Sequence, residues 1–134
     1  MKANELMIGD WAFCTYPSIN KPVRVAEIRT VSDNELKIVV YDDIRLVLNE
    51  TYMDPIPLTP EILEKNGFEW NRYKTSLNLT CGTIHIGYGF YKDCLSVSDW
   101  ADDGTAQIVS VECKYVHQLQ HALRLCEIEK EIEL

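Results

Sequence analysis

The segment 55–68 constrains the fold more than any other part of the chain, because both ends of one short helix can be read from it. Thr59 is suited to accept hydrogen bonds from the free amide groups of a first helical turn, and Pro60 fits the first helical position, where no N–H is needed. Gly67 accepts the left-handed backbone conformation that ends a helix. The segment therefore predicts a helix over 60–66 and a domain boundary just before it.

The region 1–58 is predicted to be a small antiparallel β-barrel without a helix. Its apolar residues alternate along short strands, and the alternation slips near Glu27, which predicts a β-bulge that bends the sheet. Residues 36–41 and 44–48 are expected to form a hairpin, with Leu36, Ile38 and Val40 facing Ile44, Leu46 and Leu48 across a two-residue turn.

The region 59–134 is predicted to be an α+β domain, which makes the whole chain α+β and rich in strands. Strands are expected at 73–81, 83–91, 94–97 and 105–113. A helix over 116–126 would place Val116, Leu119, Ala122, Leu123 and Cys126 on one face. The tail 128–134 alternates apolar residues with glutamates, which predicts a charged edge strand.

Charge and composition exclude several classes of protein. The chain has 134 residues, 46% of them hydrophobic, and a net charge of −8, which disfavours a polyanionic partner such as DNA or RNA. A nucleic-acid surface would require five scattered cations of the first region to share one face, namely Lys21, Arg24, Arg29, Lys37 and Arg45. No apolar run approaches the length of about 20 residues that a membrane-spanning helix needs. We therefore expect a cytoplasmic protein without membrane contact.

The cysteines point to the same compartment. There are five, an odd number, and no two are close enough for a C-x-x-C metal motif or a dense disulfide framework. Each lies in an apolar context, where a cysteine serves as a small hydrophobic residue more often than as a nucleophile. We expect free thiols, and the sequence indicates no cofactor.

Three histidines are candidates for chemistry. His117 and His121 are four residues apart on the predicted helix, the spacing with which zinc proteases hold their metal, but the sequence between them lacks the glutamate of the H-E-x-x-H motif. A solvated polar face of the helix is the favoured interpretation of this pair. His85 lies on the strand face that also contains Gly87 and Gly89, where a ligand site competes with an ordinary solvent-exposed side chain.

Four residues are candidates for a contact surface. Trp11 and Tyr16 would line a peptide groove if the first region were a peptide-binding barrel, although filling of the barrel interior is the favoured interpretation of both. His85 and Gln118 complete the set. The sequence does not show whether any of these side chains converge.

Two resemblances add to this interpretation. The segments Leu6–Trp11 and Val23–Ile28 resemble the first two strands of an SH3-like barrel. Together with 55–69 and with the Tyr115–Gln120 segment, the opening also resembles a family of small uncharacterised bacterial proteins that are often found in prophage-like or mobile gene neighbourhoods. That resemblance implies a two-part β-rich architecture and supplies no catalytic residues.

These observations favour a non-enzymatic protein that acts through protein contacts, and the family resemblance implies an accessory factor of a phage or mobile element. A small hydrolase or a ligand- or metal-binding protein that uses His85, His117 or His121 is an alternative, and it requires these groups to meet in one pocket. Nucleic-acid binding through the barrel is a further alternative. The partner is not identified by the sequence, and homo-oligomerisation is left open.

Overall fold

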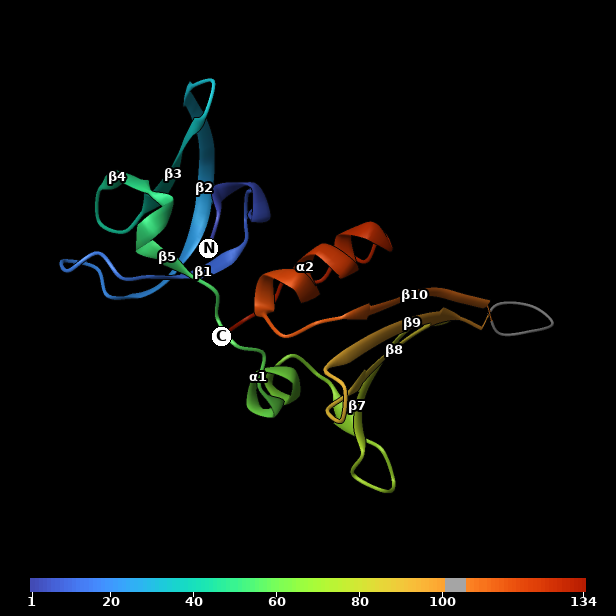
Figure 1. Cartoon of the computed structure of the whole chain (residues 1–134). Coiled ribbons are helices and arrows are strands. Elements are labelled where there is room, and N and C mark those ends of the chain that lie inside the picture. The colour runs from blue at the N-terminus through green and yellow to red at the C-terminus, as the bar shows by residue number, and fades with distance from the viewer. Residues whose placement is uncertain (101–105) are drawn as a thin grey trace. The chain divides into compact units, whose positions relative to one another are not determined.

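The chain divides into two compact units, Met1–Ile56 and Pro57–Leu134. The computed structural model describes residues 1–100 and 106–134, with side chains from 110 onward in the second range. Each unit is built on an antiparallel sheet, and both α-helices belong to the second unit (Figure 1). The predicted α+β, strand-rich class is confirmed.

The first unit is a curled five-stranded sheet that forms a half-barrel (Figure 1). Its strands are β1 (Trp11–Cys14), β2 (Lys21–Ser32), β3 (Glu35–Tyr41), β4 (Arg45–Asn49) and β5 (Met53–Asp54), in the order β4-β3-β2-β1-β5. Two 3₁₀ helices flank them, η1 (Ala3–Glu5) and η2 (Glu50–Tyr52).

The predicted bulge is confirmed, because the pairing of β2 with β3 shifts register between Val25 and Glu27. The extra residue bends a long strand, which lets the sheet curl. The predicted hairpin is also present: Ile38 pairs with Leu48 and Val40 with Leu46. Its turn is longer than predicted, since Tyr41 pairs with Arg45 and leaves three residues in the loop.

Small and branched residues form the core of the first unit. Ala12 and Cys14 of β1 are fully buried and lie in one cluster with Val25, Ile38 and Met53. Strand residues alternate between faces, so Trp11 and Phe13 occupy the opposite face of β1 and are only half-buried. The alternation thus decides which aromatic residues stay outside the core.

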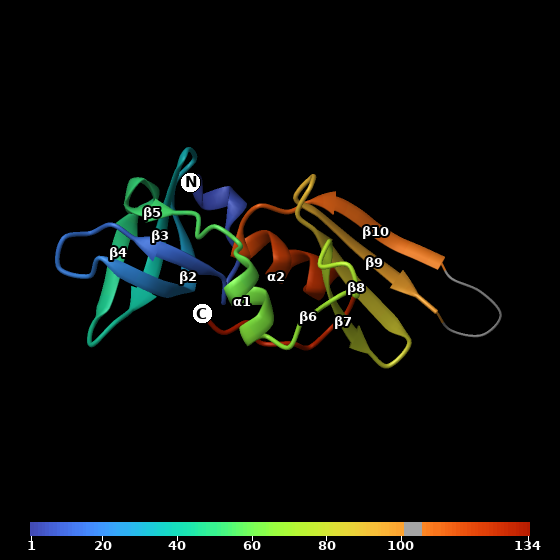
Figure 2. The same ribbon diagram turned by 90° about the horizontal axis from the view of Figure 1, so that it is seen from below.

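The second unit contains a five-stranded antiparallel sheet with the order β10-β9-β8-β7-β6. The strands are β6 (Glu69–Trp70), β7 (Ser76–Cys81), β8 (Ile84–Gly89), β9 (Cys94–Asp99) and β10 (Ala106–Glu112), and the helices are α1 (Pro60–Lys65) and α2 (Val116–Leu125). Helix α2 lies along one face of the sheet (Figure 1, Figure 2). Thr105, predicted to begin the last strand, lies outside the described residues.

The predicted ends of α1 are confirmed. Thr59 is the N-cap, and its Oγ1 accepts a hydrogen bond from the amide of Ile62 at 3.3 Å, while Pro60 occupies the first turn. Gly67 has a φ of +88°, in the left-handed region where glycine is favoured. The last helical residue is Lys65, one position earlier than predicted.

The predicted edge strand 128–134 is wrong. These residues form no strand, and only Ile132 among them is fully buried. The backbone of Glu133 pairs with the side chain of Asn66 rather than with a neighbouring strand. Alternation of apolar and acidic residues is typical of extended segments, whether or not they pair with a strand. Here the backbone of the tail bonds to the side-chain amide of Asn66 instead of to a neighbouring strand.

Two further observations concern the whole described chain. All five cysteines are free thiols, as predicted. Within residues 1–100 and 106–134, none of the helices has the length and apolar character needed to cross a membrane.

Candidate functional site

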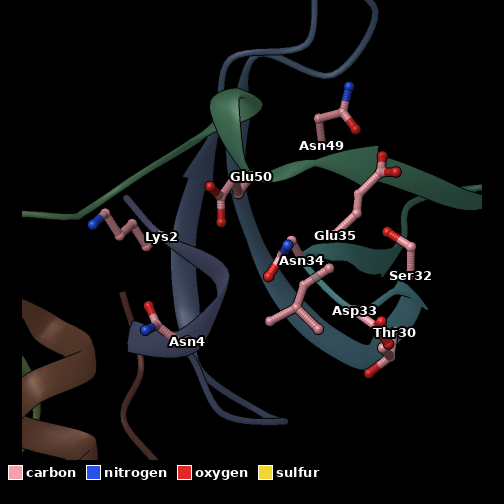
Figure 3. Close-up of a pocket in the computed structure, with 10 residues that line it drawn as sticks. Lys2, Asn4, Thr30, Ser32, Asp33, Asn34, Glu35, Asn49 and Glu50 are labelled. Carbon is pink, nitrogen blue, oxygen red and sulfur yellow. The ribbon is translucent and has the colours of Figure 1, made fainter.

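The first unit contains an open polar pocket with a volume of about 630 Å³ (Figure 3). It lies between the β2–β3 hairpin, η1 and the junction of β4 with η2, and is lined by Lys2, Asn4, Thr30, Ser32, Asp33, Asn34, Glu35, Leu36, Asn49 and Glu50. The lining holds three carboxylates against one ammonium group, together with three amides and two hydroxyls. Such a surface suits a polar or cationic group rather than an anion.

Part of this lining is already used within the unit. The Glu50 Oε2 accepts a hydrogen bond from the amide of Ala3 at 2.6 Å, which fixes η1 against η2. Glu35 forms an ion pair with Lys37 at 2.6 Å, and Lys37 also donates to the side chain of Asn49. The remaining polar residues of the pocket are mostly exposed, so the pocket is a solvated surface and not an enclosed cleft.

The five candidate cations of the first unit, Lys21, Arg24, Arg29, Lys37 and Arg45, do not form an open basic surface. Four of the five form ion pairs: Lys21 with Asp42, Arg29 and Arg45 with Glu27, and Lys37 with Glu35. A hydrogen bond from Arg29 lowers the pKa of Glu27, which keeps this shared carboxylate charged. The fifth cation, Arg24, lies over the Trp11 ring at 4.8 Å. Phosphate groups would have to compete with these carboxylates.

The two aromatic candidates of the first unit have different surroundings. Tyr16 packs against the core cluster and contacts the Tyr52 ring edge-on at 5.1 Å, in the manner expected of a barrel-filling residue. Trp11 lies on the other face of the sheet, half-buried, beneath the guanidinium group of Arg24. The structure therefore does not bring these two side chains onto one face of the sheet.

His85 lies on the face of the second sheet opposite α2. Its neighbours Ile84 and Ile86 point toward the helix side, where Ile86 is buried, so alternation directs His85 outward. The imidazole stacks on Trp100, with ring centroids 3.8 Å apart, and its Nδ1 lies 3.4 Å from the Thr80 hydroxyl. Sequence reasoning missed Trp100, because the residue follows the last position of β9 and belongs to no motif.

His117 of α2 is buried, so the interpretation of a solvated polar face was wrong for this residue, whereas His121 is half-buried. His117 is 5% exposed and Gln120 is 6% exposed, alongside the expected apolar residues of the helix. The His117 ring lies parallel to Tyr115 at 5.8 Å and edge-on to His121 at 5.6 Å. An amphipathic pattern identifies one buried stripe but cannot exclude a second one that contains polar groups.

The three histidines do not converge, because the sheet separates His85 from α2. Within the described ranges, no group of three or more histidine, cysteine or acidic side chains is placed to hold a metal ion. Gln118, the fourth contact candidate, caps α2: its Oε1 accepts hydrogen bonds from the amides of Lys114 at 2.8 Å and Tyr115 at 3.2 Å.

An exposed apolar surface on the β3–β4 hairpin was not identified from the sequence. Tyr41, Ile44 and Val47 are 55%, 65% and 46% exposed, although Ile44 was predicted to belong to the second strand of the hairpin. The longer turn removes Ile44 from the pairing, and Val47 is out of phase with the inward-facing Leu46 and Leu48. The sequence does contain an indication of this surface, because Val47 is an apolar residue at an outward-facing position of the strand.

Comparison with known proteins identifies no relative of this chain. No family model, curated protein or solved structure matches the chain. The resemblance to small bacterial proteins therefore stays a prediction, and the function must be argued from the surfaces described above.

Proposed function

We propose that this chain is a cytoplasmic, non-enzymatic protein that acts through contacts with another protein. The observation that carries the proposal is the open sheet edge at β4, which is flanked by the exposed apolar side chains of Tyr41, Ile44 and Val47. We call this surface the β4 edge. The free thiols of all five cysteines support the reducing compartment.

The backbone of the β4 edge has hydrogen-bonding groups to offer. In the described part of the chain β4 pairs with β3 alone, and it ends the strand order of its sheet. The amide of Asp42 donates to the carbonyl of Ile44 at 3.1 Å, and this sets the alternation of the hairpin. Leu46 then bonds to β3, while the N–H and C=O groups of Val47 point to the open edge.

Exposed edges of this kind template the addition of another strand unless the protein blocks them with charges or prolines. Arg45 is the only charged residue of β4, and it forms an ion pair with Glu27 on its own sheet. An extended partner segment would gain backbone hydrogen bonds along β4 and apolar contact with Val47. This combination supports a protein partner more strongly than the polar pocket supports a small ligand.

The finer assignments rest on the sequence resemblances. The curled sheet with a bulge in its longest strand supports placing the first unit among SH3-like barrels. The resemblance to prophage-associated proteins supports a role as a bacterial accessory factor of a phage or mobile element. Neither assignment determines which partner binds.

The test compares the wild-type chain with Val47→Lys as bait in pull-downs from the source cell. A lysine on this face places a charge in the contact and should abolish capture of any specific partner. Val31→Lys is the matched control, since Val31 is a similarly exposed valine on β2. Retention of the partner by the Val47→Lys bait would contradict the β4 edge, and a chain that stays monomeric and alone would contradict the function.

A further inference from the structure

Within the described part of the second unit, the face of the sheet opposite α2 has an unusual composition. We call it the outer face; it is the side of β7, β8 and β9 opposite α2 and consists of Ser76, Asn78, Thr80, His85, Gly87, Gly89, Cys94, Ser96 and Ser98. The solvent side of an antiparallel sheet usually carries long charged side chains. The outer face instead consists of small and polar residues, so its backbone lies close to the surface.

One end of the outer face carries an aromatic platform. The Trp100 indole is 55% exposed and lies parallel to the His85 imidazole, with an interplanar angle of 22°. The amide of Trp100 donates to the carbonyl of Thr83 at 2.9 Å, which fixes the backbone at the end of β9. A large apolar ring is thus held in one orientation at the surface before any ligand arrives, which lowers the entropic cost of binding.

Next to the platform, the side chains of Asn78 and Ser96 flank the backbone of Gly87. A Cβ atom at this position would lie 3.1 Å from the Asn78 Oδ1 and 3.4 Å from the Ser96 Oγ. The amide and the hydroxyl therefore lie close over the strand, where only glycine fits. Asn78 Nδ2 donates to the Ser76 Oγ at 3.1 Å and Ser96 Oγ donates to the Gly87 carbonyl at 3.5 Å, which holds both side chains in place. Successive outward positions on a strand are about 7 Å apart, so the Asn78–Ser96 pair and the His85–Trp100 stack are separated by roughly one sugar ring.

The charges on the outer face limit the class of ligand that can bind there. None of the nine outer-face residues is acidic or basic, and the flanking strands add carboxylates and no cation to this face, since Glu69 of β6 pairs with Asn78 and Glu112 of β10 pairs with Cys94. A nucleic acid would bring phosphates to a face that supplies no cation to neutralise them. These properties favour a neutral ligand. Such a ligand would have an apolar face that stacks on the indole, and hydroxyl groups that hydrogen-bond to the amide and hydroxyl side chains.

We propose that the outer face binds a neutral carbohydrate, with one pyranose ring stacked on Trp100 and hydroxyl groups bonded to Asn78 and Ser96. The C–H groups of a pyranose lie on one side of the ring and suit an indole face. This inference is independent of the β4 edge, which belongs to the other unit.

The experiment is an NMR titration of the ¹⁵N-labelled full chain with cellohexaose, maltohexaose and chitohexaose in turn. We expect at least one of them to give saturable shifts of the Thr80, His85 and Gly87 amides, with a Kd of about 1 mM or tighter. Trp100→Ala should weaken that binding about tenfold or more. Tyr91→Ala is the matched control, because Tyr91 is an aromatic residue 94% exposed at the β8–β9 turn, and it should leave the Kd unchanged.

Three results would overturn the proposal. One is the absence of saturable shifts with all three oligosaccharides. The second is binding that Trp100→Ala and Tyr91→Ala affect equally. The third is binding of oligo(dT) on the outer face in preference to the sugars, since stacking on the indole would then serve a single-stranded nucleic acid.

Discussion

The side chain of Asn66 and the backbone of Glu133 exchange two hydrogen bonds across 67 residues of sequence, with the Asn66 Nδ2 donating to the carbonyl of Glu133 at 2.7 Å and the Asn66 Oδ1 accepting from its amide at 2.8 Å. The same Nδ2 donates to the carbonyl of Ile62 at 2.7 Å, at the end of α1. Asn66 is itself buried. One amide therefore closes the helix and holds the tail beside it.

Asn66→Ala should destabilise the second unit by about 1–3 kcal/mol, because the mutation leaves backbone groups at both ends without their partner. Urea denaturation followed by circular dichroism measures the change. Asn66→Asp should be at least as damaging, since a buried carboxylate oxygen would face the two carbonyl oxygens, of Ile62 and Glu133, to which the amide now donates. Asn34→Ala, an exposed asparagine of the β2–β3 turn, is the control. An Asn66→Ala variant as stable as Asn34→Ala would mean that the tail is held by Ile132 alone.

The parts of the fold that depend on local sequence were predicted well. The cap at Thr59, the stop at Gly67 and the bulge at Glu27 each follow from neighbouring residues, and each is present. The tail could not be predicted in this way. Its path depends on Asn66, and the pattern of the tail contains no information about a side chain so far away in sequence.

The candidate surfaces were predicted less well, for a related reason. Alternation placed His85 on the outward face but did not indicate the stacked Trp100, because that contact joins β8 to the residue after β9. Helical periodicity separated His117 from the apolar stripe, yet His117 is buried. Burial of a polar side chain is set by what packs over it, and a pattern along one helix does not record this.

The stability of the protein should fall as the pH rises above about 9, because of the thiol of Cys113. Burial, followed by the nearby Asp93 carboxylate, raises the pKa of this thiol to about 12 from its ordinary value of 9.0. Between these values the unfolded chain loses the proton and the folded chain keeps it, so rising pH favours unfolding. The slope should approach about 1.4 kcal/mol per pH unit in urea denaturation between about pH 9 and about pH 12.

Burial also raises the pKa of the Tyr88 hydroxyl, which donates to the Cys113 carbonyl at 2.9 Å, and this adds to the alkaline loss above pH 10. Cys113→Ala should therefore flatten the profile just above pH 9 and leave the steeper part. Cys81→Ala is the matched control, since it removes a thiol at the end of β7 and keeps the buried one. An unchanged slope in Cys113→Ala would show that another group carries the alkaline sensitivity.

Gln118→Ala should lower the stability of the second unit by about 1 kcal/mol. The reason is its position in the first turn of α2, where Oε1 accepts from the amides of Lys114 and Tyr115. Gln118→Glu keeps an acceptor and adds negative charge near the positive end of the helix, so it should retain the wild-type stability. Thermal unfolding of the two variants separates the roles. Equal losses of stability in both variants would indicate that Gln118 acts through packing or through contact with a partner protein, and not as the cap of α2.

Isothermal titration with zinc should show no micromolar binding by the full chain. His117 and His121 lie edge-on at 5.6 Å and offer two imidazoles, whereas zinc in proteins takes three or four side-chain ligands. Within the described residues no third histidine, cysteine or carboxylate is placed to complete such a group. Binding of zinc would also have to rearrange His117, which is buried against Tyr115. Micromolar binding that His121→Ala abolishes and His85→Ala preserves would contradict this expectation, and it would favour the metal-binding alternative because only the helical pair has the spacing to share one ion.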